Sequence, residues 1–144
     1  MAPFERGVAI AFGNRLVLYD RDHLRRHDIP GQSRGLTVTP RNTRGAIAVL
    51  LDRGAAVLWH GCTEWIEIDT ELPAPRGVFV PGGPLALVSG RKAVISEVDS
   101  RGVHGVVRLE LPGRNAVGVC ATHEPGEFAV LDTTGEMIVY SVRS

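Results

Sequence analysis

Several residue types are scarce in this chain of 144 residues. Cys62 and Cys120 are the two cysteines, too few for a disulfide framework in a chain of this length. Lys92 is the only lysine among 16 basic residues, and 16 acidic residues bring the net charge to zero. A neutral chain has no long-range field that would attract nucleic acid or an anionic membrane. We therefore expect neither of them as a partner.

Long apolar runs and helical periodicity are also lacking. No apolar run approaches the roughly 20 residues of a membrane helix, and the residues after Met1 do not have the pattern of a secretory signal. We therefore expect a cytoplasmic protein. The preference for arginine over lysine, beside many Ala, Gly and Val residues, is typical of a GC-rich bacterial genome.

What the chain does contain is a series of short apolar runs rich in β-branched residues, bounded by Gly, Pro, Asp and Asn. This pattern is typical of strands joined by turns. Fourteen such runs can be distinguished, and none of the segments between them has a helical pattern. The sequence therefore predicts an all-β fold of antiparallel strands.

The strands repeat along the chain. Ala9, Ala48, Ala86 and Ala129 are separated by 39, 38 and 43 residues, and each is followed by a tight polar turn and a second apolar strand. A spacing of about 40–45 residues is that of a four-stranded β-propeller blade. We predict one β-propeller-like domain over residues 1–144, with blades at approximately 7–30, 35–69, 77–111 and 117–144.

The second repeat carries a resemblance to a known family. Gly35–Pro40 leads to Ala46–Leu51, a polar turn and a strand that ends at Trp59-His60. This order resembles a WD-repeat blade, although the family's Gly-His dipeptide is missing. The resemblance implies that Tyr19, Trp59 and Tyr140, at equivalent strand positions, pack between neighbouring blades as structural residues.

The predicted strands do not divide into whole blades. The first group lacks an inner strand unless residues 1–5 supply it, and the last group lacks its outer strand. A closed propeller has about 4–8 blades, so three and a half blades leave apolar blade faces uncovered. We expect a second copy or a different protein to complete the propeller. The alternative is a four-bladed ring closed by a terminal strand.

Four residues offer the ligand types of a tetrahedral zinc site: His60, Cys62, Cys120 and His123. The predicted fold places the first pair two blades away from the second. Neither pair belongs to a recognisable nucleophile motif, and a cysteine such as Cys120 often behaves as a small apolar residue. We therefore expect no metal, no cofactor and no catalytic residue.

Partner contacts are expected on the outer strands. The most basic stretch is Arg21–Asp28, where Arg25 and Arg26 could bind an acidic protein surface. Trp65, on the outer strand of the second group, is the third expected contact. No aromatic residues alternate with these arginines, so stacking on nucleic-acid bases is not expected.

These observations favour a binding protein over an enzyme. Propellers that resemble this chain mostly bind proteins or peptides, which is an analogy from fold. The predicted function is a non-catalytic protein–protein interaction, scaffold or regulatory module of a bacterial multiprotein system. The alternative is a small metal-binding or hydrolytic propeller that uses His60, Cys62, Cys120 and His123.

Overall fold

Strands dominate the fold. The computed structural model of the protein describes residues 2–4, 7–20, 23–39, 45–81, 84–112 and 115–142. Strands make up 65% of these residues, and none of them is helical. The all-β prediction is confirmed. The described residues accordingly include no helix long and apolar enough to span a membrane.

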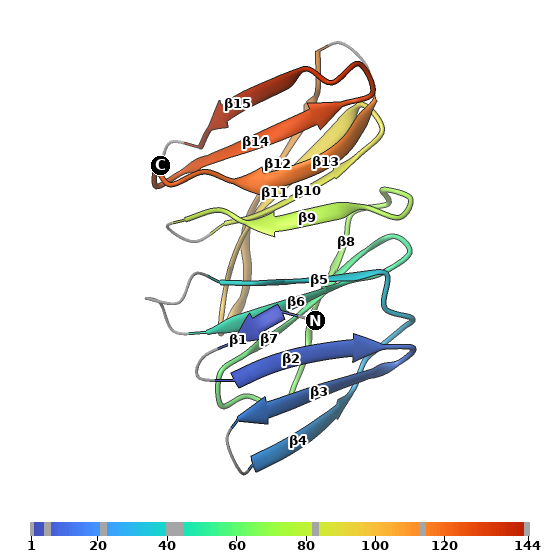
Figure 1. The fold of residues 1–144 in the computed structure, drawn as a ribbon, viewed down its shortest axis with the longest axis vertical. Coiled ribbons are helices and arrows are strands. Elements are labelled where there is room, and N and C mark those ends of the chain that lie inside the picture. Colours follow the sequence, from blue (N-terminus) through green and yellow to red (C-terminus); the bar gives the residue numbers. More distant parts are fainter. Residues whose placement is uncertain are drawn as a thin grey trace. The chain divides into compact units, whose positions relative to one another are not determined.

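The described strands form four antiparallel sheets in which sequence neighbours are paired (Figure 1). The first sheet contains β1 (Ala2–Phe4), β2 (Gly7–Phe12), β3 (Arg15–Asp20) and β4 (His23–Asp28). The second contains β5 (Gly35–Val38), β6 (Ala46–Leu50), β7 (Gly54–Trp59) and β8 (Ile66–Asp69). The third contains β9 (Arg76–Phe79), β10 (Leu85–Ser89), β11 (Lys92–Asp99) and β12 (Gly102–Glu110). The last contains β13 (Ala116–Ala121), β14 (Glu127–Asp132) and β15 (Met137–Ser141).

The described residues contain one strand, β1, in addition to those that correspond to the fourteen predicted runs. It pairs with β2 through the opposition of Pro3 and Val8, so the N-terminal residues do supply the inner strand of the first sheet. A three-residue strand that contains proline has no apolar alternation to detect, and proline is tolerated there because β1 is an edge strand. In the described residues the last sheet has three strands, as expected.

Tight two-residue turns connect the second and third strands of the first and third sheets. Gly13-Asn14 joins β2 to β3, and Gly90-Arg91 joins β10 to β11. Both glycines have positive φ angles, of 56° and 59°, which two-residue hairpin turns require. The last hairpin has a longer turn, where the Asp132 carboxylate accepts hydrogen bonds from the backbone N–H groups of Thr134 and Glu136 at 2.8 and 3.0 Å.

The chain consists of two compact units, Met1–Ala74 and Pro75–Ser144, each with two sheets. Directly opposed residues of antiparallel strands lie on the same face of a sheet. The two faces of each sheet can therefore be distinguished by whether they carry the repeated alanine, and we call them the alanine face and the opposite face.

In the first unit, the alanine face of the first sheet packs against the opposite face of the second sheet. The core residues are Ala9, Leu16, Leu18, Ile29, Ile47, Val49 and Leu58. Ala9 pairs with Leu18, whereas Ile47 pairs with Leu58 and lies next to Ala48. Apolar side chains from the two sheets therefore form one core.

The second unit repeats this arrangement. Its core residues are Val80, Ala86, Val88, Ala93, Ile95, Leu111, Phe128 and Val130. Ala86 pairs with Ile95 on the alanine face of the third sheet. Phe128 pairs with Tyr140 on the opposite face of the last sheet, and their rings stack with centroids 5.4 Å apart. The same pairing of faces thus occurs in both units.

Candidate functional site

The opposite face of the first sheet is exposed although it is largely apolar. Val8 pairs with Tyr19 and Ile10 with Val17, on the side of the sheet away from Ala9. We call this surface the first open face, and its apolar residues are Val8, Ile10, Phe12, Val17, Tyr19 and Leu24. Tyr19 is 51% exposed and Phe12 56%. Adjacent exposed apolar side chains of this kind are typical of a binding surface.

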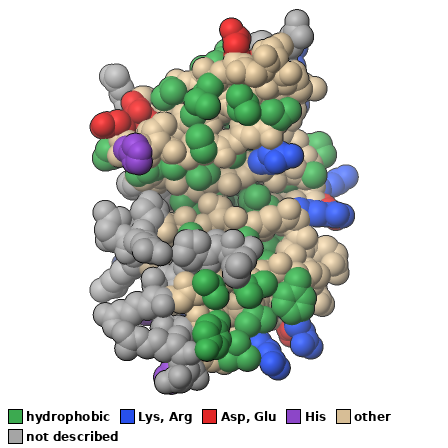
Figure 2. Space-filling view, in the orientation of Figure 1, with side chains coloured by type: hydrophobic (Ala, Val, Ile, Leu, Met, Phe, Trp, Pro, Cys, Tyr) green, Lys and Arg blue, Asp and Glu red, His purple; other side chains and the backbone are tan. Residues whose placement is uncertain are grey.

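The alanine face of the last sheet is exposed in the same way. Cys120, Ala129 and Val139 lie side by side across its three strands, and Leu131 pairs with Met137. We call this surface the last open face, and its exposed residues are Cys120, Leu131, Met137 and Val139. Val139 is 54% exposed. Figure 2 shows hydrophobic side chains gathered over the first and the last sheets.

The two sheets that carry the open faces differ in charge. Residues 116–142 contain four carboxylates, of Glu124, Glu127, Asp132 and Glu136, and neither Lys nor Arg. Residues 7–28 contain four arginines and three aspartates. Arg26 and the cross-strand pair of Arg15 and Asp28 lie beside the apolar residues of the first open face, and Glu127 is on the last open face. The described charges of the first open face therefore leave one positive charge in excess, which is complementary to Glu127.

The structure separates the three expected partner contacts. Arg26 pairs with Val17 and belongs to the first open face. Arg25 pairs with Leu18 and is on the other side of β4. Trp65 is half-buried against the core of the first unit, and its indole N–H donates a hydrogen bond of 2.8 Å to the backbone oxygen of Asp28. Trp65 is therefore an internal contact that connects β4 to the second sheet.

The predicted equivalence of Tyr19, Trp59 and Tyr140 is wrong for Trp59. The hairpin registers align Tyr19 with Leu58 and Tyr140, since these residues pair with Val8, Ile47 and Phe128. Trp59 comes one residue later and is on the other face. The reason is that Gly54 belongs to strand β7 rather than to the turn before it.

The predicted packing also differs among these positions. Leu58 is 3% exposed and Tyr140 is half-buried on Phe128, whereas Tyr19 is exposed. Tyr19 is on the first open face, which lies outside the core that the first and second sheets share. Within the first unit, Tyr19 therefore does not pack between the two sheets.

Replacing each tryptophan by phenylalanine should have different effects. The Trp59 indole N–H is buried and finds no acceptor among the described residues, whereas that of Trp65 is bonded. We expect Trp65→Phe to lower the free energy of unfolding by about 1 kcal/mol, the typical contribution of a hydrogen bond. Trp59→Phe should cost less, because it removes an unsatisfied donor. Denaturant unfolding of both variants measures the difference, and equal losses would contradict it.

The four residues of the metal or hydrolytic alternative fall into two pairs. His60 and Cys62 follow β7 in the first unit, while Cys120 and His123 are in the second unit. Among the described residues, no group of three or more His, Cys, Asp or Glu side chains could hold a metal ion. Each pair by itself supplies two of the four ligands that a structural zinc site requires.

His60 and Cys62 line a cavity of about 10 Å³ together with Arg25 and His27. This volume is enough for about one water molecule. Burial, and then the positive charge of Arg25, lower the pKa of His27 from its ordinary value of 6.5. A guanidinium at the cavity opposes binding of a cation, so the cavity suits neither a metal ion nor a substrate.

The lowered pKa of His27 makes the stability of the first unit depend on pH. Above pH 6.5 the imidazole is neutral in both the folded and the unfolded state. As the pH falls below 6.5, the unfolded state takes up the proton first, so the free energy of unfolding should decrease down to the folded pKa. Denaturant unfolding between pH 5 and 7.5 tests this. The His27→Asn variant should lose part of the pH dependence, and an unchanged dependence would contradict the assignment.

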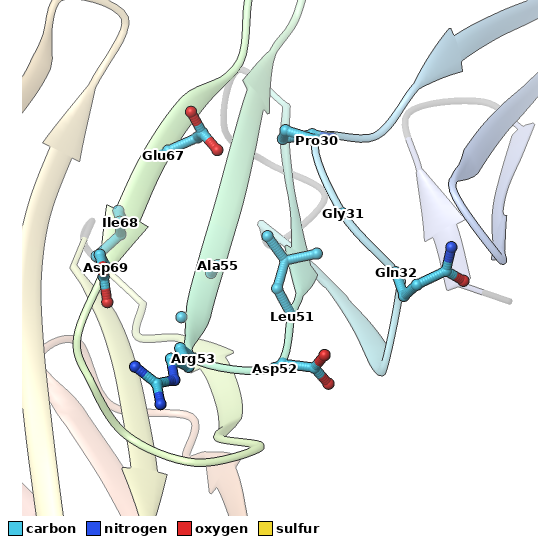
Figure 3. Close-up of a pocket in the computed structure, with 11 residues that line it drawn as sticks. Pro30, Gly31, Gln32, Leu51, Asp52, Arg53, Ala55, Glu67, Ile68 and Asp69 are labelled. Carbon is cyan, nitrogen blue, oxygen red and sulfur yellow. The ribbon is translucent and has the colours of Figure 1, made fainter.

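A larger cavity, of about 260 Å³, is in the first unit (Figure 3). Its lining comes from Pro30–Gln32, Leu51–Ala55 and Glu67–Asp69. Figure 3 shows Leu51 near the middle of the view and the Gln32 side chain directed away from it. The described lining includes no hydroxyl, thiol or imidazole that could act as a nucleophile with a neighbouring base. The cavity is also somewhat smaller than the roughly 300–1,000 Å³ of typical ligand pockets.

Comparisons with known proteins identify a fold rather than a family. No protein-family model and no curated protein matches the chain. A solved structure of streptogramin B lyase, a β-propeller protein, is similar with a TM-score of 0.58 and 16% sequence identity. The match covers 99% of this chain and 55% of that one, so this chain spans about half the length of its structural neighbour. WD-repeat membership stays a prediction, and the likeness shows that the chain has the sheet architecture of a β-propeller.

Proposed function

We propose that this chain is a non-catalytic protein-interaction module that serves as a scaffold or regulatory component of a cytoplasmic bacterial multiprotein system. The observation that carries the proposal is the pair of open faces on the first and last sheets. A protein that binds these faces would remove their apolar side chains from water. Each Å² of apolar surface buried in this way contributes about 25 cal/mol before the cost of association is subtracted.

The chemistry of the open faces supports protein as the ligand. The first open face combines apolar side chains with an aromatic ring, Tyr19, and an arginine, Arg26. Tyrosine and arginine are enriched at the energetically important positions of protein interfaces. The first open face extends across β2, β3 and β4. It therefore suits another folded surface better than a small molecule.

The competing hypothesis is a hydrolytic or metal-binding protein. His60 and Cys62 line one small cavity, which is the observation in its favour. Two observations disfavour this hypothesis. The guanidinium of Arg25 lines the same cavity, and Cys120 and His123 are in the other unit. Metal content of the purified protein and hydrolysis of ester, phosphate and glycoside substrates test this hypothesis. Stoichiometric metal, or an activity that His60→Ala abolishes, would favour it over the proposed function.

Capture of proteins from an extract of the source cells tests the proposed function. The bait is the tagged chain, compared with a double variant of the two open faces, Tyr19→Asp with Val139→Asp. The control is Val107→Asp, which changes a valine of β12 that is 57% exposed and belongs to neither open face. We expect specific proteins to bind the natural chain and the control but not the double variant. The same set of proteins on all three baits would contradict the proposal.

A further inference from the structure

We infer that a second copy of this chain covers both open faces, with the first open face of each copy packed against the last open face of the other. This inference rests on the proposed function and names the partner. It follows from a packing rule that the chain already uses twice. In each unit, the alanine face of one sheet is covered by the opposite face of the next sheet.

Each sheet has one face that this rule does not cover within its unit, and the faces left over on the first and last sheets are the exposed ones. The last open face is the alanine face of its sheet, with Ala129 paired with Val139. In the equivalent positions the third sheet has Ala86 and Ile95, which pack against the last sheet. By the same rule, the last open face should be covered by the opposite face of another sheet.

The first open face is such an opposite face. Tyr19 and Val8 occupy the positions of Leu58 and Ile47 in the second sheet. Ile10 likewise occupies the position of Val49, two hairpin pairs closer to the turn. Leu58, Ile47 and Val49 are all buried against the alanine face of the first sheet. The first open face therefore offers side chains of similar size in the same arrangement.

Pairing of unlike faces is also favoured by charge. Arg26 and the cross-strand pair of Arg15 and Asp28 lie beside the first open face, and Glu127 is on the last open face. Pairing two last open faces would instead bring two Glu127 carboxylates together. Complementary charges at an interface select the correct partner and orientation more than they add affinity.

The number of sheets fits two copies. The structural neighbour is about twice as long as this chain, since the match covers 99% of this chain and 55% of the other. Two copies would contribute eight sheets, and closed propellers have about 4–8 blades. A dimer with one such contact at each end would cover all four open faces of the two copies.

Light scattering coupled to size exclusion, over a range of concentrations, measures the assembly. We expect the natural chain to have twice the mass of one chain, which is 15.5 kDa. Tyr19→Asp and Val139→Asp should each weaken dimerisation by about 30-fold or more, the effect of losing a strongly contributing interface residue. The control Val107→Asp should leave the mass unchanged. Circular dichroism and the unfolding midpoint establish that each variant is folded.

Mixing the two variants distinguishes unlike from like pairing. The Tyr19→Asp chain keeps an intact last open face, and the Val139→Asp chain keeps an intact first open face. We expect the mixture to form dimers at concentrations where each variant alone is monomeric. If only one of the two substitutions lowers the mass, like faces pair and the inference is wrong. A natural chain of 15.5 kDa at every concentration would also overturn it, while face-dependent capture of other proteins would still support the proposed function.

Discussion

Replacing Gly54 by alanine should lower the free energy of unfolding by about 3 kcal/mol or more, because the new methyl group has no room. Gly54 pairs with Asp69 where β7 runs beside β8. A Cβ atom at this position would overlap the carbonyl oxygen of Ile68 and lie 3.0 Å from its carbonyl carbon. It would also lie 3.2 Å from the Cα atom of Asp69. These are backbone atoms of the neighbouring strand, so the clash can be relieved only by separating the strands.

Gly105→Ala is the matched control for this effect. Gly105 is also a strand glycine, on β12, and the nearest atom to its added Cβ would be a carboxylate oxygen of Glu97 at 3.9 Å. We expect its free energy of unfolding to stay within about 1 kcal/mol of that of the natural chain. Denaturant unfolding of both variants measures the difference. A Gly54→Ala chain as stable as the control would mean that β7 and β8 are not paired in this register.

Replacing Phe128 by alanine is expected to cost about 3–5 kcal/mol, the range found for large aromatic residues in protein cores. Phe128 is 2% exposed, stacks on Tyr140 and belongs to the core that joins the last sheet to the third. Its loss would leave a cavity beneath the only three-stranded sheet among the described residues. The last sheet should therefore be the first part of the second unit to lose protection from hydrogen exchange.

Phe12→Ala provides the contrast, because Phe12 is 56% exposed on the first open face. At concentrations where the chain is a single copy, the substitution should change the free energy of unfolding by less than about 1 kcal/mol. At higher concentrations, where two copies pair, the Phe12→Ala substitution should weaken dimerisation. A loss of stability for Phe12→Ala as large as that for Phe128→Ala, in a single chain, would mean that the first open face is already covered.

The alternation of apolar residues predicts much of the fold. The repeated alanines are the right markers, because Ala9, Ala48, Ala86 and Ala129 all lie the same number of residues before their hairpin turns. The errors arise where a turn is read as one residue too long. Counting Gly54 as part of the turn shifts Trp59 by one position, and in a strand a one-residue shift moves a side chain to the other face.

The candidate site is harder to predict for a related reason. Arg25 and Arg26 are adjacent in the sequence, and only pairing with β3 shows that Arg26 is on the first open face. The sequence also predicts that Trp65 is a contact for a partner. It cannot show that the indole N–H of Trp65 bonds to Asp28, because these residues are 37 positions apart in the chain. Alternation predicts that apolar faces exist, but only the packing within each unit shows which face of the first sheet and which face of the last sheet lie outside its core.

Photocross-linking from position 19 tests the pairing of unlike faces most directly. A photoreactive phenylalanine analogue replaces Tyr19 in unlabelled chains, which are mixed with ¹⁵N-labelled natural chains and irradiated. Amine-reactive cross-linkers would form few cross-links, because Lys92 is the only lysine in the chain. We expect cross-links to ¹⁵N-labelled peptides from residues 116–142. Cross-links to residues 7–28 of the labelled copy, or cross-links within the unlabelled chain alone, would contradict the account.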